Sequence, residues 1–463
     1  MTGAADVLPS SFRDPAGFVF RRDGVLLRQV NEVHRSHFDL LTSSGLYDAL
    51  TDAGLLIPHE LVDDEPAAAG AYRIIRPRPV AFISYPYEWC FSQLRDAALA
   101  TLRIQSAALE HGMTLRDAST FNMQFDRGRP LLIDTLSFES LVEGRPWIAY
   151  RQFCQHFLAP LALMSYRDAR LGLLLREHLD GVPLDLAAQL LPKGARLRPP
   201  LLLHVFSHAK SQRRHAADDT PAAAAGRGGK FSMQAFRGLL DSLRAGIEGL
   251  SLPSGFSEWR NYYDEATHYS DRASKHKEEL VDACIAESSP DTVWDLGANV
   301  GRFSRLATAR GIPTVAFDVD PACVDEAYRR AAADGEPNLL PLVLDLANPS
   351  PAIGWANRER MTVEERGPAD LVLALALVHH LAIGNNVPLE SLAAFLARIG
   401  RQVAIEFVPK EDEKVQRLLM NREDVFAGYT AEGFERSMSA HFDVLEKLPI
   451  DDSPRTLYLL RAR

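Results

Sequence analysis

From Asp291 onward, apolar runs alternate with segments whose apolar residues recur at helical spacing. The apolar runs cover residues 292–296, 314–319, 339–346, 370–378 and 402–408. Each run has the length of a buried strand, and the segments between them, such as 321–333 and 389–399, have the length and period of helices. This order predicts a parallel sheet covered by helices.

The end of the chain departs from this order. Residues 442–450 (FDVLEKLPI) and 455–463 (RTLYLLRAR) have the composition of strands, and only the turn DDSP separates them. Because this turn leaves no room for a helix, the two strands are expected to form an antiparallel hairpin. The predicted fold of the C-terminal half is therefore α/β, a Rossmann-like sheet that ends in an antiparallel hairpin.

The clearest break in the hydrophobic pattern lies at residues 208–233, where small, polar and basic residues replace any periodicity. No lysine precedes Lys193, although many follow it, so the two halves also differ in composition. A length of 463 residues suits two or three domains at roughly 150 residues each. We predict an N-terminal module at 1–207, a linker or mobile loop at 208–233 and a C-terminal domain at 234–463.

Composition excludes several classes of function. The formal net charge of −10 argues against a nucleic-acid partner, which normally requires a basic face. The apolar runs stop well short of the roughly 20 residues that span a bilayer, and the first residues lack a secretory signal. The four cysteines are too scattered for a disulfide framework or a metal site, so no metal is predicted. These features predict a soluble cytoplasmic protein.

The first strand of the C-terminal domain runs into a glycine-rich turn, DLGANVG, and a helix is expected to follow. Gly297 and Gly301 allow the backbone to turn sharply and to present its N–H groups to a ligand. Open α/β sheets bind nucleotide-like cofactors at such strand ends. The alternative for the glycines is an ordinary tight turn, and the alternative for Asp318 and Asp345, which end the next two strands, is helix capping.

The turn resembles the first motif of class I S-adenosylmethionine-dependent methyltransferases, with Asn299 in place of the middle glycine. Asparagine tolerates a left-handed backbone, so the turn is compatible with this replacement. The resemblance implies that S-adenosylmethionine is the cofactor, that Asp318 accepts hydrogen bonds from the ribose and that Asp345 lies near the adenine amine. The chain is also similar to a bacterial group of nodulation-related methyltransferases. The implied cofactor-binding residues are Asp295, Gly297, Asn299, Gly301, Asp318, Asp345 and Ala374.

Methyl transfer is an in-line displacement that needs alignment of the reactants and, for a hydroxyl or ammonium acceptor, removal of a proton. His379 and His380, at the end of the fourth predicted strand, are the candidate bases. Adjacent residues on an extended strand point in opposite directions, so at most one faces the acceptor, and the alternative is a structural histidine. Glu406, Asn385 and Asn386 are further pocket candidates. The expected acceptor is a hydroxyl or amine of a small molecule or glycan-like metabolite.

The N-terminal half contains a second pattern, in which four residues separate Asp117 from Asn122 and Asp134 ends the apolar run PLLID. This pattern resembles the catalytic segment of protein kinases and aminoglycoside phosphotransferases. The resemblance implies an α+β kinase-like domain in which Asp117 orients an acceptor hydroxyl while Asn122 and Asp134 hold magnesium.

Two departures from the kinase pattern bear on this half. It has no glycine-rich phosphate loop, and it has no lysine to anchor the nucleotide phosphates; Arg73, Arg76 and Arg78 are the candidate replacements, although arginine is not equivalent to lysine. We therefore favour a kinase-like module retained for substrate recognition. One alternative is a phosphotransferase that uses Asp117, Asn122 and Asp134. Another is a purely structural role, in which Asp117 caps a turn and the other two residues brace a hairpin. A third is a cofactor-binding regulator without turnover.

Overall fold

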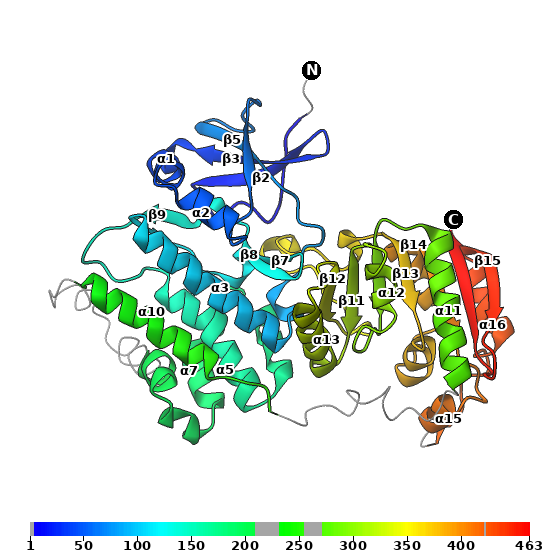
Figure 1. Ribbon diagram of the computed structural model, residues 1–463. Coiled ribbons are helices and arrows are strands. Elements are labelled where there is room, and N and C mark those ends of the chain that lie inside the picture. Colours follow the sequence, from blue (N-terminus) through cyan, green and yellow to red (C-terminus); the bar gives the residue numbers. More distant parts are fainter. Residues whose placement is uncertain (1–3, 209–230, 254–270, 421–422) are drawn as a thin grey trace. The chain divides into compact units, whose positions relative to one another are not determined.

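The computed structural model describes residues 4–208, 231–253, 271–420 and 423–463 (Figure 1). The chain forms two compact units. The first contains Met1–Ser254 together with Ile353–Arg360, and the second contains Gly255–Ala352 together with Met361–Arg463.

The first unit begins with a five-stranded antiparallel sheet in the order β1-β2-β3-β5-β4. Two helices lie between β3 and β4 in the chain. Phe20, Leu27 and Ile74 form one of the apolar clusters of this sheet. The elements are β1 (Asp6–Val7), β2 (Gly17–Arg22), β3 (Val25–Asn31), α1 (Arg35–Ser43), α2 (Leu46–Asp52), β4 (His59–Val62) and β5 (Ala71–Pro77).

A mainly helical part follows, built around the long and largely buried helix α3. Two short two-stranded antiparallel sheets, β6-β9 and the hairpin β7-β8, lie beyond α3 in the chain. An antiparallel sheet followed by a helical part of this kind is the arrangement of a kinase-like fold, so the predicted fold of this half is confirmed. The elements are α3 (Phe91–Glu110), β6 (Met113–Leu115), β7 (Met123–Asp126), β8 (Arg129–Leu132), β9 (Phe138–Ser140), α4 (Tyr150–Phe153), α5 (Ala159–Tyr166), α6 (Leu174–Glu177), α7 (Leu184–Leu190), α8 (Pro199–Leu201) and α10 (Met233–Glu248).

Helix α10 corrects the predicted domain boundary. The sequence placed residues from 234 onward in the C-terminal domain, but α10 packs on α3 and α8 and belongs to the first unit. Its apolar stripe, which includes Phe236 and Leu243, is buried there. The approach is close, because a Cβ added at Gly246 would lie 2.9 Å from the Cβ of Pro200. Most of the predicted linker, residues 209–230, lies outside the described residues.

The segment Ile353–Arg360 also belongs to the first unit, although its neighbours in the chain belong to the second. The buried carboxylate of Glu359 accepts a hydrogen bond from Arg13 Nη2 at 2.6 Å. The guanidinium of Arg360 lies 4.3 Å from the centre of the Phe121 ring. An ion pair and a cation–π contact therefore fix this segment, and the sequence did not predict it.

The second unit contains a seven-stranded sheet in the order β12-β11-β10-β13-β14-β16-β15. The neighbouring pairs are parallel except those that involve β16. If the strands of this sheet are numbered 1 to 7 along the chain, the order is 3-2-1-4-5-7-6 with strand 7 reversed. The strands are β10 (Val293–Leu296), β11 (Thr314–Asp318), β12 (Leu339–Val343), β13 (Ala369–Ala374), β14 (Gly400–Phe407), β15 (Phe442–Pro449) and β16 (Thr456–Ala462).

Helices flank this sheet, as Figure 1 shows. Helix α11 contacts α12, and α14 contacts α16, so the helices pack in pairs beside the strands. Val281 and Ile285 of α11 join Leu371 and Leu373 of β13 in the main apolar cluster. The parallel strands, their helices and the final hairpin were all predicted, and this part of the fold is confirmed. The helices are α11 (Asp271–Ser288), α12 (Ser304–Thr308), α13 (Pro321–Asp334), α14 (Leu389–Ile399), α15 (Glu413–Leu419) and α16 (Ala431–Ser439).

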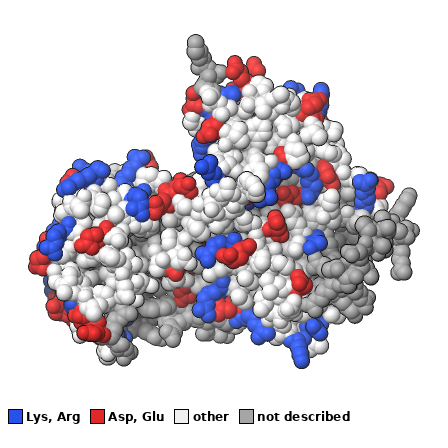
Figure 2. Space-filling model, turned by 180° about the vertical axis from the view of Figure 1, so that it is seen from behind, with Lys and Arg blue, Asp and Glu red and all other residues white. Residues whose placement is uncertain are grey.

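Charged side chains of both signs are interspersed over the face of the molecule seen in Figure 2. No field of a single sign is visible on this face among the described residues. Separately, none of the helices in the described ranges combines the length and apolar character needed to cross a bilayer.

Candidate cofactor site and a second polar cluster

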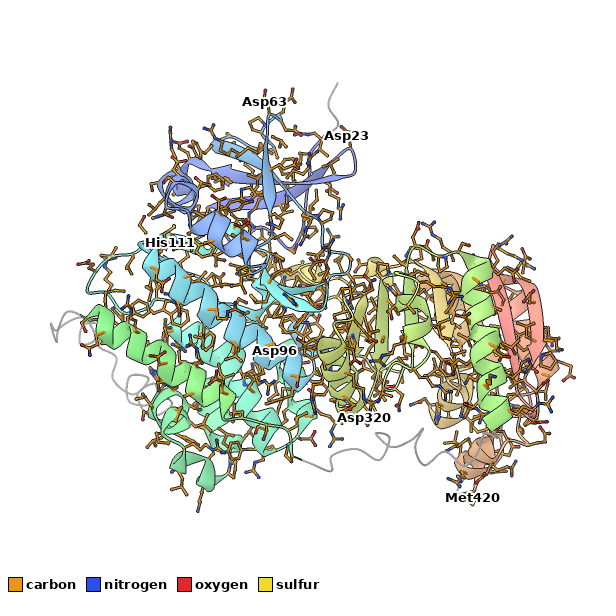
Figure 3. The ribbon with its side chains drawn as sticks, viewed as in Figure 1. Asp23, Asp63, Asp96, His111, Asp320 and Met420 are labelled. Carbon is orange, nitrogen blue, oxygen red and sulfur yellow. The ribbon has the colours of Figure 1, made fainter. Side chains whose placement is uncertain are left out.

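The strand order of the second unit reverses between β10 and β13, and ligands of open α/β sheets bind at the carboxyl ends of the strands at such a point. Figure 3 labels Asp320, two residues beyond β11, and Met420, just beyond α15. Both lie at the same edge of the second unit, toward which the carboxyl ends of β11 and β14 lead. The predicted cofactor residues lie in or just beyond the carboxyl ends of β10, β11, β12 and β13.

The glycine-rich turn after β10 adopts a left-handed backbone at three positions, with φ of 77° at Gly297, 53° at Asn299 and 80° at Gly301. The asparagine thus adopts the conformation that a glycine would take. The sequence predicted that this turn presents its N–H groups to a ligand, and this prediction is wrong for the first of them. The N–H groups of Gly297 and Ala298 donate to the carbonyl of Phe317, so the turn is held against β11.

Asp318, the last residue of β11, is the carboxylate that this turn positions. Its Oδ2 accepts a hydrogen bond from the Asn299 N–H at 2.7 Å, and its Oδ1 accepts one from the Asp320 N–H at 2.9 Å. Burial raises the pKa of Asp318 to about 6. The Val319 N–H is a third backbone donor to this carboxylate, which leaves about one of its four lone-pair sites. Next to it, the side chain of Val319 is 60% exposed, so an apolar surface lies beside the carboxylate.

Asp295, Asp345 and Ala374 have different surroundings from Asp318. Asp295 is buried and accepts a hydrogen bond from the Ser304 hydroxyl at 2.6 Å, and burial raises its pKa to about 6. Asp345 is exposed and accepts a hydrogen bond from the Ala347 N–H at 2.8 Å, which closes a turn. Ala374 is buried at the end of β13, so a ligand there meets its backbone.

The chain turns sharply after β13, and this turn corrects the geometry expected for the two histidines. The strand ends at Ala374 rather than near 378, and Ala376 has φ of 50°. His379 and His380 lie on a helical turn, with ring centres 4.2 Å apart, and not on an extended strand. The rule that neighbouring side chains point in opposite directions therefore does not apply here.

The two histidines differ in exposure. His379 is 1% exposed, and neither ring nitrogen has a hydrogen-bond partner among the described residues. Burial lowers its pKa to about 2, so the ring is neutral. His380 is half-buried, and burial also lowers its pKa. His380 is the histidine that a ligand can reach.

Glu406, on β14, forms a hydrogen bond with the turn that follows β13. It is fully buried and accepts hydrogen bonds from the Lys277 Nζ at 2.6 Å and from the Ala376 N–H at 2.8 Å. Arg455 Nη1 lies 3.3 Å from its other oxygen. Sequence reasoning missed both cations. A signal for Lys277 was present, because it falls on the apolar stripe of α11 that Ala273 and Val281 also occupy; no such signal marks Arg455.

A cavity of about 440 Å³ lies beside the segment that follows His380. Asn386 and Glu390 contribute polar groups to its lining, and Phe426 and Tyr429 contribute aromatic rings. Asn386 was a predicted pocket residue and lines this cavity; Asn385 is exposed nearby.

In the first unit, the fold brings Asp117, Asn122 and Asp134 into one polar cluster. Asp117 Oδ1 accepts hydrogen bonds from the Ser119 N–H at 2.9 Å and the Gln152 amide at 2.8 Å. Burial and the neighbouring Asp134 raise the pKa of Asp117.

Asn122 and Asp134 are linked through the Ser137 hydroxyl. Asn122 Nδ2 donates to the Ser137 oxygen at 3.2 Å, and that hydroxyl donates to Asp134 Oδ2 at 2.6 Å. Arg28, on β3, forms an ion pair with Asp134 Oδ1 at 2.5 Å, and sequence reasoning missed it.

The three arginines considered as replacements for a phosphate-binding lysine have partners elsewhere in the first unit. Arg76 pairs with Glu60, Arg78 pairs with Asp126 at 2.6 Å, and the Arg73 guanidinium lies 4.5 Å from the centre of the Tyr72 ring. Across the described ranges, no group of three or more His, Cys, Asp or Glu side chains is arranged to hold a metal ion.

The strand order with its reversed last strand, together with the glycine-rich turn and Asp318, defines the second unit as a class I S-adenosylmethionine-dependent methyltransferase domain. The first unit is kinase-like. The chain is 37% identical over 455 residues to the nodulation protein NoeA of Rhizobium meliloti (strain 1021). The aligned residues cover 97% of this chain and 94% of that protein. The chain therefore belongs to the NoeA family. No family model matches it.

Solved structures with similarity to the chain include methyltransferases. The bifunctional kinase-methyltransferase WbdD is 19% identical with a TM-score of 0.28, covering 44% of this chain and only 42% of WbdD. The magnesium protoporphyrin IX methyltransferase of Synechocystis PCC 6803, with bound S-adenosylmethionine, is 19% identical with a TM-score of 0.31, covering 45% of this chain and 92% of that one. The N-methyltransferase NodS of Bradyrhizobium japonicum WM9 is 12% identical with a TM-score of 0.31, covering 42% and 98%. The strand order, and not these similarities, defines the fold.

Proposed function

We propose that the second unit transfers a methyl group from S-adenosylmethionine to a hydroxyl or amine of a small-molecule or glycan-like acceptor. The observation that carries this proposal is the state of Asp318. Its hydrogen-bond donors are backbone N–H groups and not a cation, and it stands at the carboxyl end of β11, the neighbour of β10, at which the sheet order reverses.

The residues at this edge fit the cofactor. Asp318 accepts hydrogen bonds from the ribose hydroxyls, and the exposed side chain of Val319 packs on the purine. Asp295 holds the start of α12 through Ser304 and so keeps the glycine-rich turn in place. When bound, S-adenosylmethionine supplies a methyl group on a positively charged sulfur, which is already a strong electrophile.

We assign His380 as the group that accepts the proton lost by the acceptor. A neutral imidazole is needed for this role, and burial lowers the pKa of His380 so that the ring is neutral at pH 7. His379 is assigned a structural role because its side chain is almost fully enclosed.

The cavity beside the His380 segment supports an acceptor of the proposed kind. Sugar-like molecules present apolar ring faces and hydroxyl edges, and the cavity combines the rings of Phe426 and Tyr429 with the polar groups of Asn386 and Glu390. We place the protein in the cytoplasm, because its four cysteines are all free and buried, as a reducing compartment favours.

Two measurements on the full chain test the proposal. Isothermal titration calorimetry with S-adenosylhomocysteine is expected to show binding that Asp318→Asn weakens, and NAD is expected not to bind. Mass spectrometry of metabolites and glycans from cells with and without the protein is expected to reveal an acceptor heavier by one CH₂ group. A folded protein that binds no S-adenosylhomocysteine would contradict the proposal. Binding without any methylated product would favour the regulator instead.

A further inference from the structure

The Asp134 cluster of the first unit is the part of the molecule that the proposed methyl transfer does not use. The kinase-like resemblance implies that Asn122 and Asp134 hold magnesium, and a magnesium site needs oxygen ligands with free lone pairs. The contacts around both residues show whether they meet this requirement.

Hydrogen-bond donors already surround the Asp134 carboxylate. Oδ1 accepts from the Leu136 N–H at 3.1 Å and from the Arg28 guanidinium at 2.5 Å. Oδ2 accepts from the Ser137 hydroxyl at 2.6 Å. Three donors thus occupy a group with about four lone-pair sites.

Arg28 occupies the place of a cation in this cluster. It is 9% exposed on the central strand β3, and its pairing lowers the pKa of Asp134. A guanidinium is always charged, so its attraction for the carboxylate does not depend on a metal or on pH near 7. Nε of Arg28 has no hydrogen-bond partner among the described residues, which leaves that donor available inside the cluster.

The remaining charges near Asp134 are also balanced within the protein. Arg116 Nη2 pairs with Asp14 at 2.5 Å. His34 is buried, and its pKa falls to about 4, so it is neutral. Arg28 and Arg116 both lower the pKa of Asp134, and the charge of Asp134 in turn raises the pKa of Asp117.

We infer that Arg28 has taken the place of the divalent cation in the kinase-like unit, so that its polar cluster is complete without metal and does not bind magnesium-ATP. The donor set does not fit the metal that the fold family implies. Asp117 likewise has internal donors, which are the Ser119 N–H, the Gln152 amide and the Asn122 side chain.

The test uses the full chain and Mn²⁺ as the probe, with binding read from the loss of the free-ion signal in electron paramagnetic resonance. The wild type and Asp134→Asn are expected to bind Mn²⁺ equally, because no Mn²⁺ site in the wild type depends on Asp134. Arg28→Met is expected to create a site by freeing Asp134, and the double variant Arg28→Met with Asp134→Asn is expected to lose it. Arg76→Met is the matched control, because it removes an exposed arginine of the same sheet that pairs with Glu60.

Thermal unfolding supplies a second readout. Magnesium is expected to raise the melting temperature of Arg28→Met and to leave wild type and Arg76→Met unchanged, because only the first has an uncompensated carboxylate. Mn²⁺ or magnesium-ATP binding by wild type that depends on Asp134 would overturn the inference, as would a folded Arg28→Met protein that gains no site. If Arg28→Met does not fold, the comparison of wild type with Asp134→Asn decides the question alone.

Discussion

Asp318 in the second unit and Asp134 in the first unit were predicted from the same kind of signal, an aspartate at the end of an apolar run. Their surroundings differ in charge. Backbone N–H groups bond Asp318, and burial raises its pKa to about 6. Asp134 is paired with Arg28, which lowers its pKa. A carboxylate without an internal cation retains capacity for a ligand, whereas a carboxylate with one has become part of the scaffold.

Glu406 gives the largest test of this distinction, because it is a scaffold carboxylate inside the ligand-binding unit. Glu406→Gln leaves the buried Lys277 without its carboxylate partner, so we expect a loss of about 3–5 kcal/mol in unfolding free energy. Arg455 keeps a second ion pair, with Asp412 at 2.7 Å. Scanning calorimetry measures this loss. The unfolding transition of the second unit is the one whose melting temperature rises when S-adenosylhomocysteine is added. Glu278→Gln, which removes an exposed pair with Arg302, is the control and is expected to cost under about 1 kcal/mol. Equal losses in the two variants would show that the buried network is not special.

The histidine pair sharpens the same comparison on the side of catalysis. His380→Ala is expected to reduce methyl transfer by roughly 10²–10³-fold and to leave cofactor affinity unchanged, because the half-buried ring accepts a proton. His379→Ala is expected to lower the melting temperature and to change turnover little, because its ring is enclosed. The measurements are single-turnover rates with the identified acceptor and calorimetric affinities. A larger loss of rate in the His379 variant would reverse the assignment.

The sequence predicted the order of strands and helices in the second unit because each element carries its own periodic pattern. It did not predict where β13 ends. The apolar residues continue past Ala374 into a helical turn, and only the positive φ at Ala376 separates the two. The sequence also assigned the residues of α10 to the wrong domain, since an apolar stripe does not specify the unit on which it packs.

The site residues show the same limit. Aspartates at strand ends were visible because a local motif surrounds them. The cations that decide their roles were not visible: Lys277 lies 129 residues from Glu406, and Arg28 is on β3, whereas Asp134 follows β8. Pairing across such distances in the chain depends on the fold, so the sequence could not distinguish the ligand-binding carboxylate from the scaffold carboxylates.

Asp318→Asn tests the ligand-binding half of the comparison. The substitution is expected to weaken S-adenosylhomocysteine binding by about 1–3 kcal/mol, because the ribose hydroxyls lose an ionised acceptor. It is not expected to lower the melting temperature at pH 7, because it removes a carboxylate whose ionised form burial disfavours. Asp134→Asn provides the contrast, since it is expected to destabilise the first unit while S-adenosylhomocysteine affinity stays unchanged. A destabilised Asp318 variant with normal affinity would mean that Asp318 also belongs to the scaffold.

The smallest expected effect is the pH dependence that follows from the raised pKa of Asp318. Between its ordinary value of 3.8 and about 6, the native state holds a proton that the unfolded state has lost, so the contribution of this group to stability falls as pH rises through that window. Ligand binding changes in the opposite direction, because the ribose hydroxyls require the ionised form. We expect affinity for S-adenosylhomocysteine to rise about tenfold from pH 5 to pH 7 and then to level off, as calorimetry at constant ionic strength will measure. Asp295 also has a pKa of about 6, so the Asp318→Asn variant is the necessary control. A slope that persists in this variant would assign the titration to Asp295, and a wild-type affinity independent of pH would show that Asp318 is not the ribose acceptor.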